Sequence, residues 1–303
     1  ERDITRPSYA FEIEQDAALY DAKEFSQFNF VTKDTSNLHF KALQIFQRLI
    51  AFHLSDENKA ALIDCDMERI QFVNNYGTMT QKNELYKNCL EHLYKKYDNE
   101  EEAMMAGYLL ALWYQSKGNN YKSSKNFEDK MSYQKALSIC DEIIKKFPNS
   151  EGGINCYNLR LNIVGMELSM QTEKINIPNQ PFRTLINFRN TDNIYLRVIK
   201  LTSTLKRQLD KALDESNDKY WKILTKASRE KEWTQSLPIT EDHQYHSCEI
   251  PVQGLPIGEY ILLASVNQSF SLNKNPLTAS RFYVSNISYI NSGREVFVLN
   301  RET

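Results

Sequence analysis

The spacing of the apolar residues changes at about residue 180, and this change constrains the fold more than any other feature. Before it, apolar side chains recur every three or four residues, as in amphipathic helices. After it, they alternate along short segments, as in β-strands. The segment Ile175–Pro181 carries two prolines in polar surroundings, which disfavour helix and mark a boundary. The sequence therefore predicts a helical domain over residues 1–176 and a strand domain over residues 181–303.

In the helical domain, the first 36 residues are polar with scattered aromatic side chains and predict an extended lead-in with one short helix. From Leu38 onwards the period is helical. The first apolar stripe, which we expect to form the buried face of its helix, consists of Leu38, Ala42, Ile45, Phe46, Leu49 and Phe52. The helices predicted after it cover Ala60–Gly77, Leu85–Tyr97, Leu110–Gly118, Tyr133–Phe147 and Gly152–Gln171.

Two of these helices carry the strongest repeat signal. The run Leu110–Tyr114 fits the first helix of a tetratricopeptide unit, and Tyr133–Pro148 fits the second helix with its terminating proline. Ala111 and Ala136 are small enough for the two helices to approach closely, and the polar residues 119–132 are interpreted as an insertion between them. The pattern resembles tetratricopeptide repeats, which implies an α-solenoid of stacked hairpins. The alternative is an irregular helical bundle with one chance match.

In the strand domain, about seven short segments with turn signals between them predict an antiparallel, immunoglobulin-like β-sandwich. The expected strands cover Phe182–Phe188, Asn193–Leu201, Tyr245–Val252, Gly258–Ser265, Arg281–Ser285, Ser288–Ile290 and Glu295–Leu299. The run Leu205–Ala227 has a helical period and predicts a helical insertion, over about residues 203–232, that lies against the sheet. Asn291–Arg294 is typical of a hairpin turn.

The turn Gly254–Gly258 and the strand after it are the best-defined part of this domain. Pro256 sets the backbone angle of a tight turn, and Gly258 suits its last position. Tyr260 stands where β-sandwiches place a tyrosine corner, so we expect its hydroxyl group to bond back to nearby backbone. These features serve packing rather than catalysis.

Composition narrows the class of protein. The 303 residues are 41% hydrophobic with a net charge of −2, which argues against nucleic-acid binding through a basic face. No apolar run approaches the length of a membrane span. The chain begins at Glu1 and is interpreted as a processed or excised segment, so any signal peptide or lipid anchor would have been lost. The five cysteines are dispersed; most are expected to be buried thiols, and one disulfide remains open.

One group of residues has metal-ligand chemistry: His243, His246 and Cys248. On a strand, His246 and Cys248 would share a face while His243 would not. A closed zinc site needs four ligands, and no fourth is evident, so we expect polar residues at a strand edge and no metal.

Two further charged groups are candidates for a site. Asp214, Ser216 and Asp218 have the spacing of a calcium loop, but Lys219 and Thr225 occupy the positions of its glycine and glutamate, so solvent-exposed charges on the inserted helix are expected. The acidic run from Asp98 to Glu102 is interpreted as a helix cap with first-turn acids. The motifs of serine hydrolases, zinc proteases and P-loop proteins are absent, so we expect no catalytic residue, no cofactor and no enzyme.

Read together, residues 181–303 resemble a macroglobulin-like domain from the N-terminal region of bacterial, Bacteroides-type alpha-2-macroglobulin proteins. The segments that carry the resemblance are Ile194–Val198, Trp233 with Leu237-Pro238, Tyr245–Pro251, Leu255–Tyr260, Phe282–Asn286 and Val296–Thr303. The last segment looks like the exit from one such domain into the next.

The resemblance implies a scaffold segment of a secreted or envelope-anchored lipoprotein, periplasmic or at the cell surface, that entraps proteases. Its partners would be further macroglobulin-like domains of the same chain and, through the full-length protein, proteases; a membrane would be contacted only through the lost lipid anchor. The family's thioester motif C-x-E-Q follows none of the five cysteines, so no trapping residue carries over.

A cell-surface module that binds a peptide or a glycan is the alternative function. It would use aromatic clusters, either Trp113 with Tyr114 and Tyr121, or Tyr220 with Trp221 and Trp233. The competing interpretation, which we favour, is that these rings fill the cores.

Overall fold

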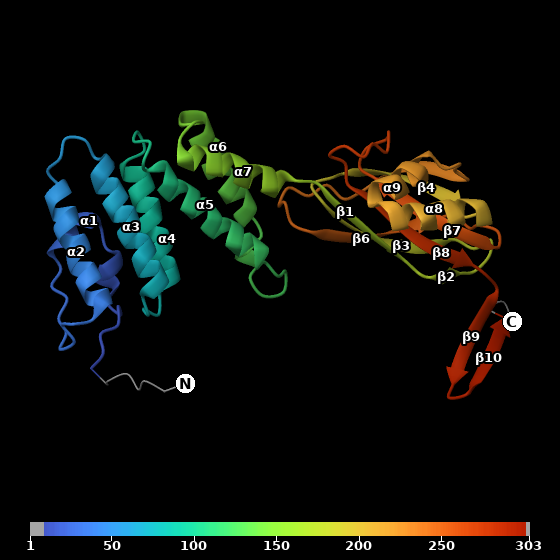
Figure 1. The fold of residues 1–303 in the computed structure, drawn as a ribbon, viewed down its shortest axis with the longest axis horizontal. Helices are drawn as coiled ribbons and strands as arrows, with labels where there is room; N and C mark the ends of the chain where they lie inside the picture. The colour runs from blue at the N-terminus through green and yellow to red at the C-terminus, as the bar shows by residue number, and fades with distance from the viewer. Residues whose placement is uncertain (1–8, 301–303) are drawn as a thin grey trace. The chain divides into compact units, whose positions relative to one another are not determined.

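The structure is a computed structural model that describes residues 9–300. The chain divides into two compact units, Glu1–Ile163 and Val164–Thr303. The described residues hold nine α-helices and several largely antiparallel sheets, with the long helices first and the strands after them (Figure 1). The fold is therefore α+β, with a helical unit followed by a strand unit, as the change in apolar spacing predicts.

In the helical unit most helices pack on the next helix along the chain (Figure 1). The helices are η1 (Asp16–Leu19), α1 (Ala22–Gln27), α2 (Leu38–His53), α3 (Ala60–Tyr76), α4 (Lys82–Lys96), α5 (Met104–Asn119), η2 (Phe127–Asp129), α6 (Ser132–Lys146) and α7 (Glu151–Val164). The short helix α1 matches the single helix expected in the lead-in, whose first eight residues lie outside the described part.

The first long helix is predicted correctly, but its buried face is not. In α2 the buried side chains are Phe40, Leu43 and Ile50. Most of the expected stripe is exposed instead, and Leu38 and Phe52 keep 78% and 72% of their surface. The correction has a physical cause: the lead-in helix α1 and helix α3 pack on the other side of α2.

Helices α5 and α6 approach closely through small residues. Ala111 and Ala136 are completely buried, as expected from their size. The ring of Tyr133 lies about 3.1 Å from where Gly118 would carry a side chain, so a larger residue at 118 would displace the ring. Between the helices, the polar insertion forms turns and the short helix η2.

The helix predicted over Gly152–Gln171 is wrong in its second half. Helix α7 ends at Val164, and the chain then forms strand β1 (Glu167–Thr172), which pairs with β3 (Phe182–Arg189). Leu168 and Met170 alternate with polar residues and pack against the strand core. The boundary between the units therefore lies ahead of the proline segment Ile175–Pro181.

The strand unit contains two sheets and a separate hairpin. Its remaining elements are β2 (Ile175–Asn176), β4 (Asn193–Lys200), α8 (Ser203–Glu215), α9 (Asn217–Lys226), β5 (Lys231–Ser236), β6 (His246–Val252), β7 (Gly258–Ser265), β8 (Leu277–Val284), β9 (Ile287–Ser292) and β10 (Glu295–Asn300). One sheet has the order β1-β3-β6 and the other β2-β8-β7-β4-β5, antiparallel except for the two-residue β2.

The two sheets share one core, an arrangement consistent with a β-sandwich. Ile186 of β3 and Ile250 of β6 belong to the same buried cluster as Leu196 of β4 and Leu262 of β7. Tyr260 is 1% exposed, and its hydroxyl group donates to the backbone oxygen of Pro256 at 3.0 Å, which confirms the expected tyrosine corner. The other face of the longer sheet is covered by α8 and α9.

The single helix predicted between the strands is two helices. They meet at Ser216, whose extended backbone ends α8 and whose side chain accepts a hydrogen bond from the backbone N–H of Lys219 to cap α9. The insertion also ends earlier than expected, because β5 begins at Lys231. The seven expected strands are present, and β1, β2 and β5 are additional.

Strands β9 and β10 form a hairpin that pairs with no other strand of the described residues. Its turn lies at the predicted position, with Gly293 in the left-handed region at φ +62°. Ile287, Tyr289, Val296 and Val298 point to one face, and Ile290, Phe297 and Leu299 to the other. All seven are exposed, so the hairpin presents apolar side chains on both faces.

Candidate functional site

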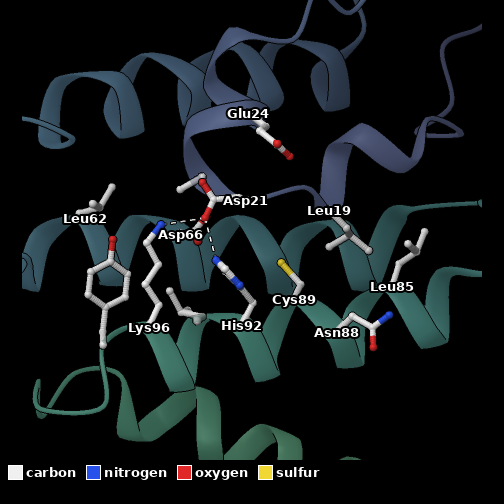
Figure 2. Close-up of a pocket in the computed structure, with 13 residues that line it drawn as sticks. Leu19, Asp21, Glu24, Leu62, Asp66, Leu85, Asn88, Cys89, His92 and Lys96 are labelled. Carbon is white, nitrogen blue, oxygen red and sulfur yellow. Dashed lines mark hydrogen bonds and ion pairs between the residues drawn. The ribbon is translucent and has the colours of Figure 1, made fainter.

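A cavity of about 410 Å³ opens where the lead-in packs on α3 and α4 (Figure 2). Asp21 lies at its rim, caps α1 and accepts bonds from Lys96 Nζ at 2.8 Å and His92 Nε2 at 3.0 Å. Partial burial would raise the pKa of Asp21, but its hydrogen bonds, led by that from Lys96, outweigh burial and hold the pKa below its ordinary value. The charged groups at the rim therefore hold the lead-in in place.

A buried ion pair lies beneath this rim. Arg69 is completely buried, and its Nε donates to Asp66 Oδ1 at 2.9 Å. Its Nη1 donates to the carbonyl oxygen of Ala18 at 2.7 Å, and its guanidinium carbon lies 4.6 Å from the centre of the Phe25 ring. Burial raises the pKa of Asp66 although Arg69 pulls it down. One arginine thus joins α3 to the lead-in.

The cavity lacks an activated nucleophile. Burial raises the pKa of Cys89 to about 11, against the effect of Arg69, so the thiol is protonated at neutral pH. The carboxyl groups of Asp66 and Asp21 are bonded to side chains that hold the lead-in, α3 and α4 together. These contacts join the lead-in to α3 and α4.

A second groove in the helical unit, of about 590 Å³, is lined by carboxylates. Asp64 and Glu68 come from α3, Glu101 and Glu102 from the turn before α5, and Glu151 from the start of α7. Burial and the nearby Glu102 raise the pKa of Asp64. Within residues 9–300, no set of three histidine, cysteine, aspartate or glutamate side chains is arranged to hold a metal ion.

A third cavity, of about 440 Å³, lies in the strand unit between the edge strand β5 and the end of β6. Trp233, Pro181, Pro251 and Val252 supply its apolar lining, and Gln235 is among its polar residues. Trp233 also packs against the core shared by the two sheets. The apolar lining of this cavity therefore lies next to the edge strand of the five-stranded sheet.

His243, His246 and Cys248 do not form a common site. His246 and Cys248 both lie on β6, and His246 Nε2 is bonded to Asp242 Oδ1 at 2.8 Å. His243 precedes the strand in the left-handed region, and its Nδ1 is bonded to Asn190 Oδ1 at 2.7 Å. The hydrogen bonds of both histidines therefore hold β6 and the loop before it in place.

The two acidic candidates also have structural roles. Ser216 caps α9, and Asp214 lies in α8 while Asp218 lies in α9, so the three do not form a loop. The interpretation of Asp98–Glu102 as a cap with first-turn acids is wrong. Helix α5 begins later, with Ala103 at its cap and no acidic residue in its first turn. Asp98 instead pairs with Lys146 Nζ at 2.9 Å.

The aromatic clusters mostly support the cores. Trp113 and Tyr114 are partly buried against the helical core, and Trp113 Nε1 donates to Asn83 Oδ1 at 2.9 Å. Tyr220 and Trp221 pack where α9 covers the sheet. Tyr121 is half-buried beyond α5. Among the six rings, Trp233 combines core packing with the lining of a cavity.

Sequence reasoning missed Arg69 and the edge strand β5. An Asp and an Arg three residues apart on a helix are common on surfaces, and no local signal shows that Ala18 approaches from the lead-in. Strand β5 reads Lys-Glu-Trp-Thr-Gln-Ser, in which Trp233 is the only large apolar residue.

Within the described part of the chain, no helix has the length and apolar character that crossing a bilayer requires.

No family model matches the sequence, and no curated protein sequence matches it. Solved structures match at low identity. An Escherichia coli alpha-2-macroglobulin structure spanning domains MG0-NIE-MG1 is 14% identical with a TM-score of 0.32, and the match covers 46% of this chain and 46% of that one. A second structure of that protein, spanning domains NIE-MG1, is 15% identical with a TM-score of 0.27, and the match covers 46% of this chain and 71% of that one. A CARDB domain from Pyrococcus furiosus, in complex with di-metal ions, is 12% identical with a TM-score of 0.24. That match covers 40% of this chain and 87% of the CARDB chain. At these TM-scores the matches carry no argument about function.

Proposed function

We propose that this chain is a non-catalytic scaffold and interaction segment of a large alpha-2-macroglobulin-like inhibitor that entraps proteases in the periplasm or at the cell surface. The proposal rests on the sequence segments of residues 181–303 that resemble a macroglobulin-like domain. It assigns the helical unit to α-solenoid-like packing of the tetratricopeptide type and the two sheets to a macroglobulin-type β-sandwich. Its partners are further macroglobulin-like domains and, through the whole protein, proteases.

The structural observation that supports the scaffold part of this proposal is the β9–β10 hairpin. A two-stranded hairpin is marginally stable by itself in water. When one face of an antiparallel pair meets solvent, that face is normally polar. Here apolar residues occupy both faces, with Tyr289 and Val298 on one and Ile290 and Phe297 on the other. Such a hairpin is suited to a protein built from successive β-domains, in which neighbouring β-structure covers it.

The arrangement of titratable groups supports a non-catalytic role. The cavity beneath the lead-in holds a protonated thiol, Cys89, and a carboxylate, Asp66, that is paired with a buried arginine. Neither is poised as a nucleophile or a general base at neutral pH.

The decisive test uses the protein expressed from the whole gene. We expect trypsin mixed with it to remain active on a small chromogenic peptide while losing activity on a large protein such as casein, because an entrapped protease is sterically shielded. Trypsin whose active site has been blocked covalently is the matched control, and it should not be captured because it cannot cut. Equal inhibition on both substrates, or no inhibition, would contradict the trapping role.

A second measurement tests the scaffold role directly. Amide hydrogen exchange over Ile287–Asn300 should be fast in residues 1–303 alone and slow in the protein expressed from the whole gene, because further β-structure would cover the hairpin. Sequencing the gene beyond codon 303 completes the test. A stop codon immediately after Thr303, or equal exchange in both proteins, would overturn the proposal.

A further inference from the structure

We propose that the free edge of β5, with the cavity beside Trp233, binds an extended polypeptide segment that joins the five-stranded sheet as an added strand. This proposal is independent of the protease-trapping role, because it depends on the strand unit alone. Recognition of this kind combines main-chain hydrogen bonds along a sheet edge with a pocket for alternate side chains.

The unpaired backbone of β5 supplies the hydrogen-bonding groups. Strand β5 ends the order β2-β8-β7-β4-β5, so one of its edges pairs with β4 and the other pairs with no strand of residues 9–300. The register pairs Trp233 with Leu196, and the N–H of Leu237 donates to Asp192. Since backbone groups alternate between the two edges of a strand, those of Glu232 and Thr234 point away from β4. At Ser236 the carbonyl oxygen already accepts from Gln235 Nε2 at 2.9 Å, so the open stretch is short.

The cavity supplies a pocket beside this edge. A strand added to β5 would cross the mouth of the cavity between β5 and β6, and alternate side chains would point into its volume of about 440 Å³. Pro181, Pro251 and Val252 would surround those side chains together with the ring of Trp233. Pro251 also lacks an N–H group, which makes the facing strand β6 a poorer pairing partner than β5.

The charges around the cavity favour a neutral segment. Lys231 Nζ donates to Gln253 Oε1 at 3.3 Å and to the carbonyl oxygen of Gly254 at 3.2 Å. Glu232 accepts from Arg197 Nη2 at 3.2 Å and also pairs with Arg229. Both charges are used within the unit, so a charged residue in the bound segment would lose its hydration without gaining an opposite partner. We therefore expect the bound segment to be extended and uncharged, with small polar residues alternating with aliphatic ones.

The test uses residues 1–303 and an acetylated, amidated probe peptide of sequence Thr-Val-Thr-Leu-Thr-Val-Thr. We expect peptide addition to shift the NMR signals of the Glu232 and Thr234 amides and the Trp233 indole, and to slow hydrogen exchange at the two amides. The same peptide with every amide N-methylated should produce none of these changes, because it has no backbone donor.

A pair of variants separates backbone pairing from side-chain contact. Thr234→Pro removes one outward N–H group and leaves the ladder to β4 in place, so we expect peptide binding to weaken by roughly 2- to 10-fold. Thr234→Ala keeps that N–H group and should bind as the parent does. Equal binding by the two variants would overturn the proposal, as would an unchanged Glu232 amide at millimolar peptide. An oligosaccharide that shifts the Trp233 indole without the two amides would indicate a glycan site instead.

Discussion

At the scale of single residues, the distance along the chain to a partner decides what the sequence can predict. The hydroxyl group of Tyr260 bonds to Pro256, four residues away, and local turn chemistry is sufficient to predict it. Arg69 bonds to Ala18, which is 51 residues away, and nothing near Arg69 announces that contact. The tyrosine corner could therefore be predicted and the buried arginine could not.

The Arg69→Met variant tests the buried pair. It should lower the free energy of unfolding of the helical unit by about 3–5 kcal/mol at about pH 7, because Asp66 would remain buried without a counter-charge. Burial raises the pKa of Asp66, and removing Arg69 takes away the main group that lowers it and leaves only the weaker effect of Lys96. The carboxyl group then becomes neutral as the pH falls, so the loss should be smaller at about pH 5 than at about pH 7. Urea unfolding at the two pH values measures both effects.

The control for this prediction is a pair on the surface. Arg160 Nε lies 2.7 Å from Asp141 Oδ1, and about half of each side chain is exposed, at 41% and 58%. Arg160→Met should cost less than about 1 kcal/mol, because water screens the pair. A similar cost for Arg69→Met and Arg160→Met, or a loss for Arg69→Met that grows as the pH falls, would contradict the account of the buried pair.

At the scale of elements, periodicity places helices and strands more reliably than it places their faces. The helical period of α2 is clear in the sequence, but apolar residues occur around much of its circumference. Which of them are buried depends on where α1 and α3 pack, and that is a tertiary property. Strands β1 and β5 were missed because each carries few large apolar side chains; β1 reads Glu-Leu-Ser-Met-Gln-Thr.

The Gly152→Ala variant tests the packing of α7. Alanine normally stabilises a helix relative to glycine by up to about 1 kcal/mol. Here its methyl group would lie 2.5 Å from the backbone of Met104, so a clash with backbone replaces that gain. We expect the free energy of unfolding to fall by about 1–3 kcal/mol, as in overpacked cores. Asn158→Ala at an exposed position of the same helix is the control and should be neutral or stabilising. A stabilised Gly152→Ala variant would show that α5 and α7 can separate at no cost.

At the scale of the whole molecule, the chain contains cores that do not share residues across its two units. The large cluster of the helical unit ends with Ile163, and both clusters of the strand unit begin after it. The switch in apolar spacing predicted separate cores for the two units, because helix stripes and alternating faces bury their side chains in different ways. The strand unit divides its own core into two clusters. The exact place of the boundary was harder to predict, since β1 lacks the composition of a typical strand.

Tyr260→Phe tests whether the two units unfold separately. Loss of the bond to Pro256 should destabilise the strand unit by about 0.5–1.5 kcal/mol. Urea unfolding should show two transitions, and only the one assigned to the strand unit should move to lower urea. Tyr289→Phe, on the exposed hairpin, should leave both unchanged. A single transition that moves as a whole would show that the units unfold together.

The contact between Arg69 and the lead-in also affects the order in which the protein can form during synthesis. Ala18 is synthesised 51 residues before the arginine whose guanidinium group binds it, and Cys89, whose sulfur atom lies 3.6 Å from Arg69 Nη2, follows 20 residues later. Early residues must therefore wait, unprotected, for helices made after them. We therefore expect chaperones to bind the lead-in until α3 and α4 have been synthesised.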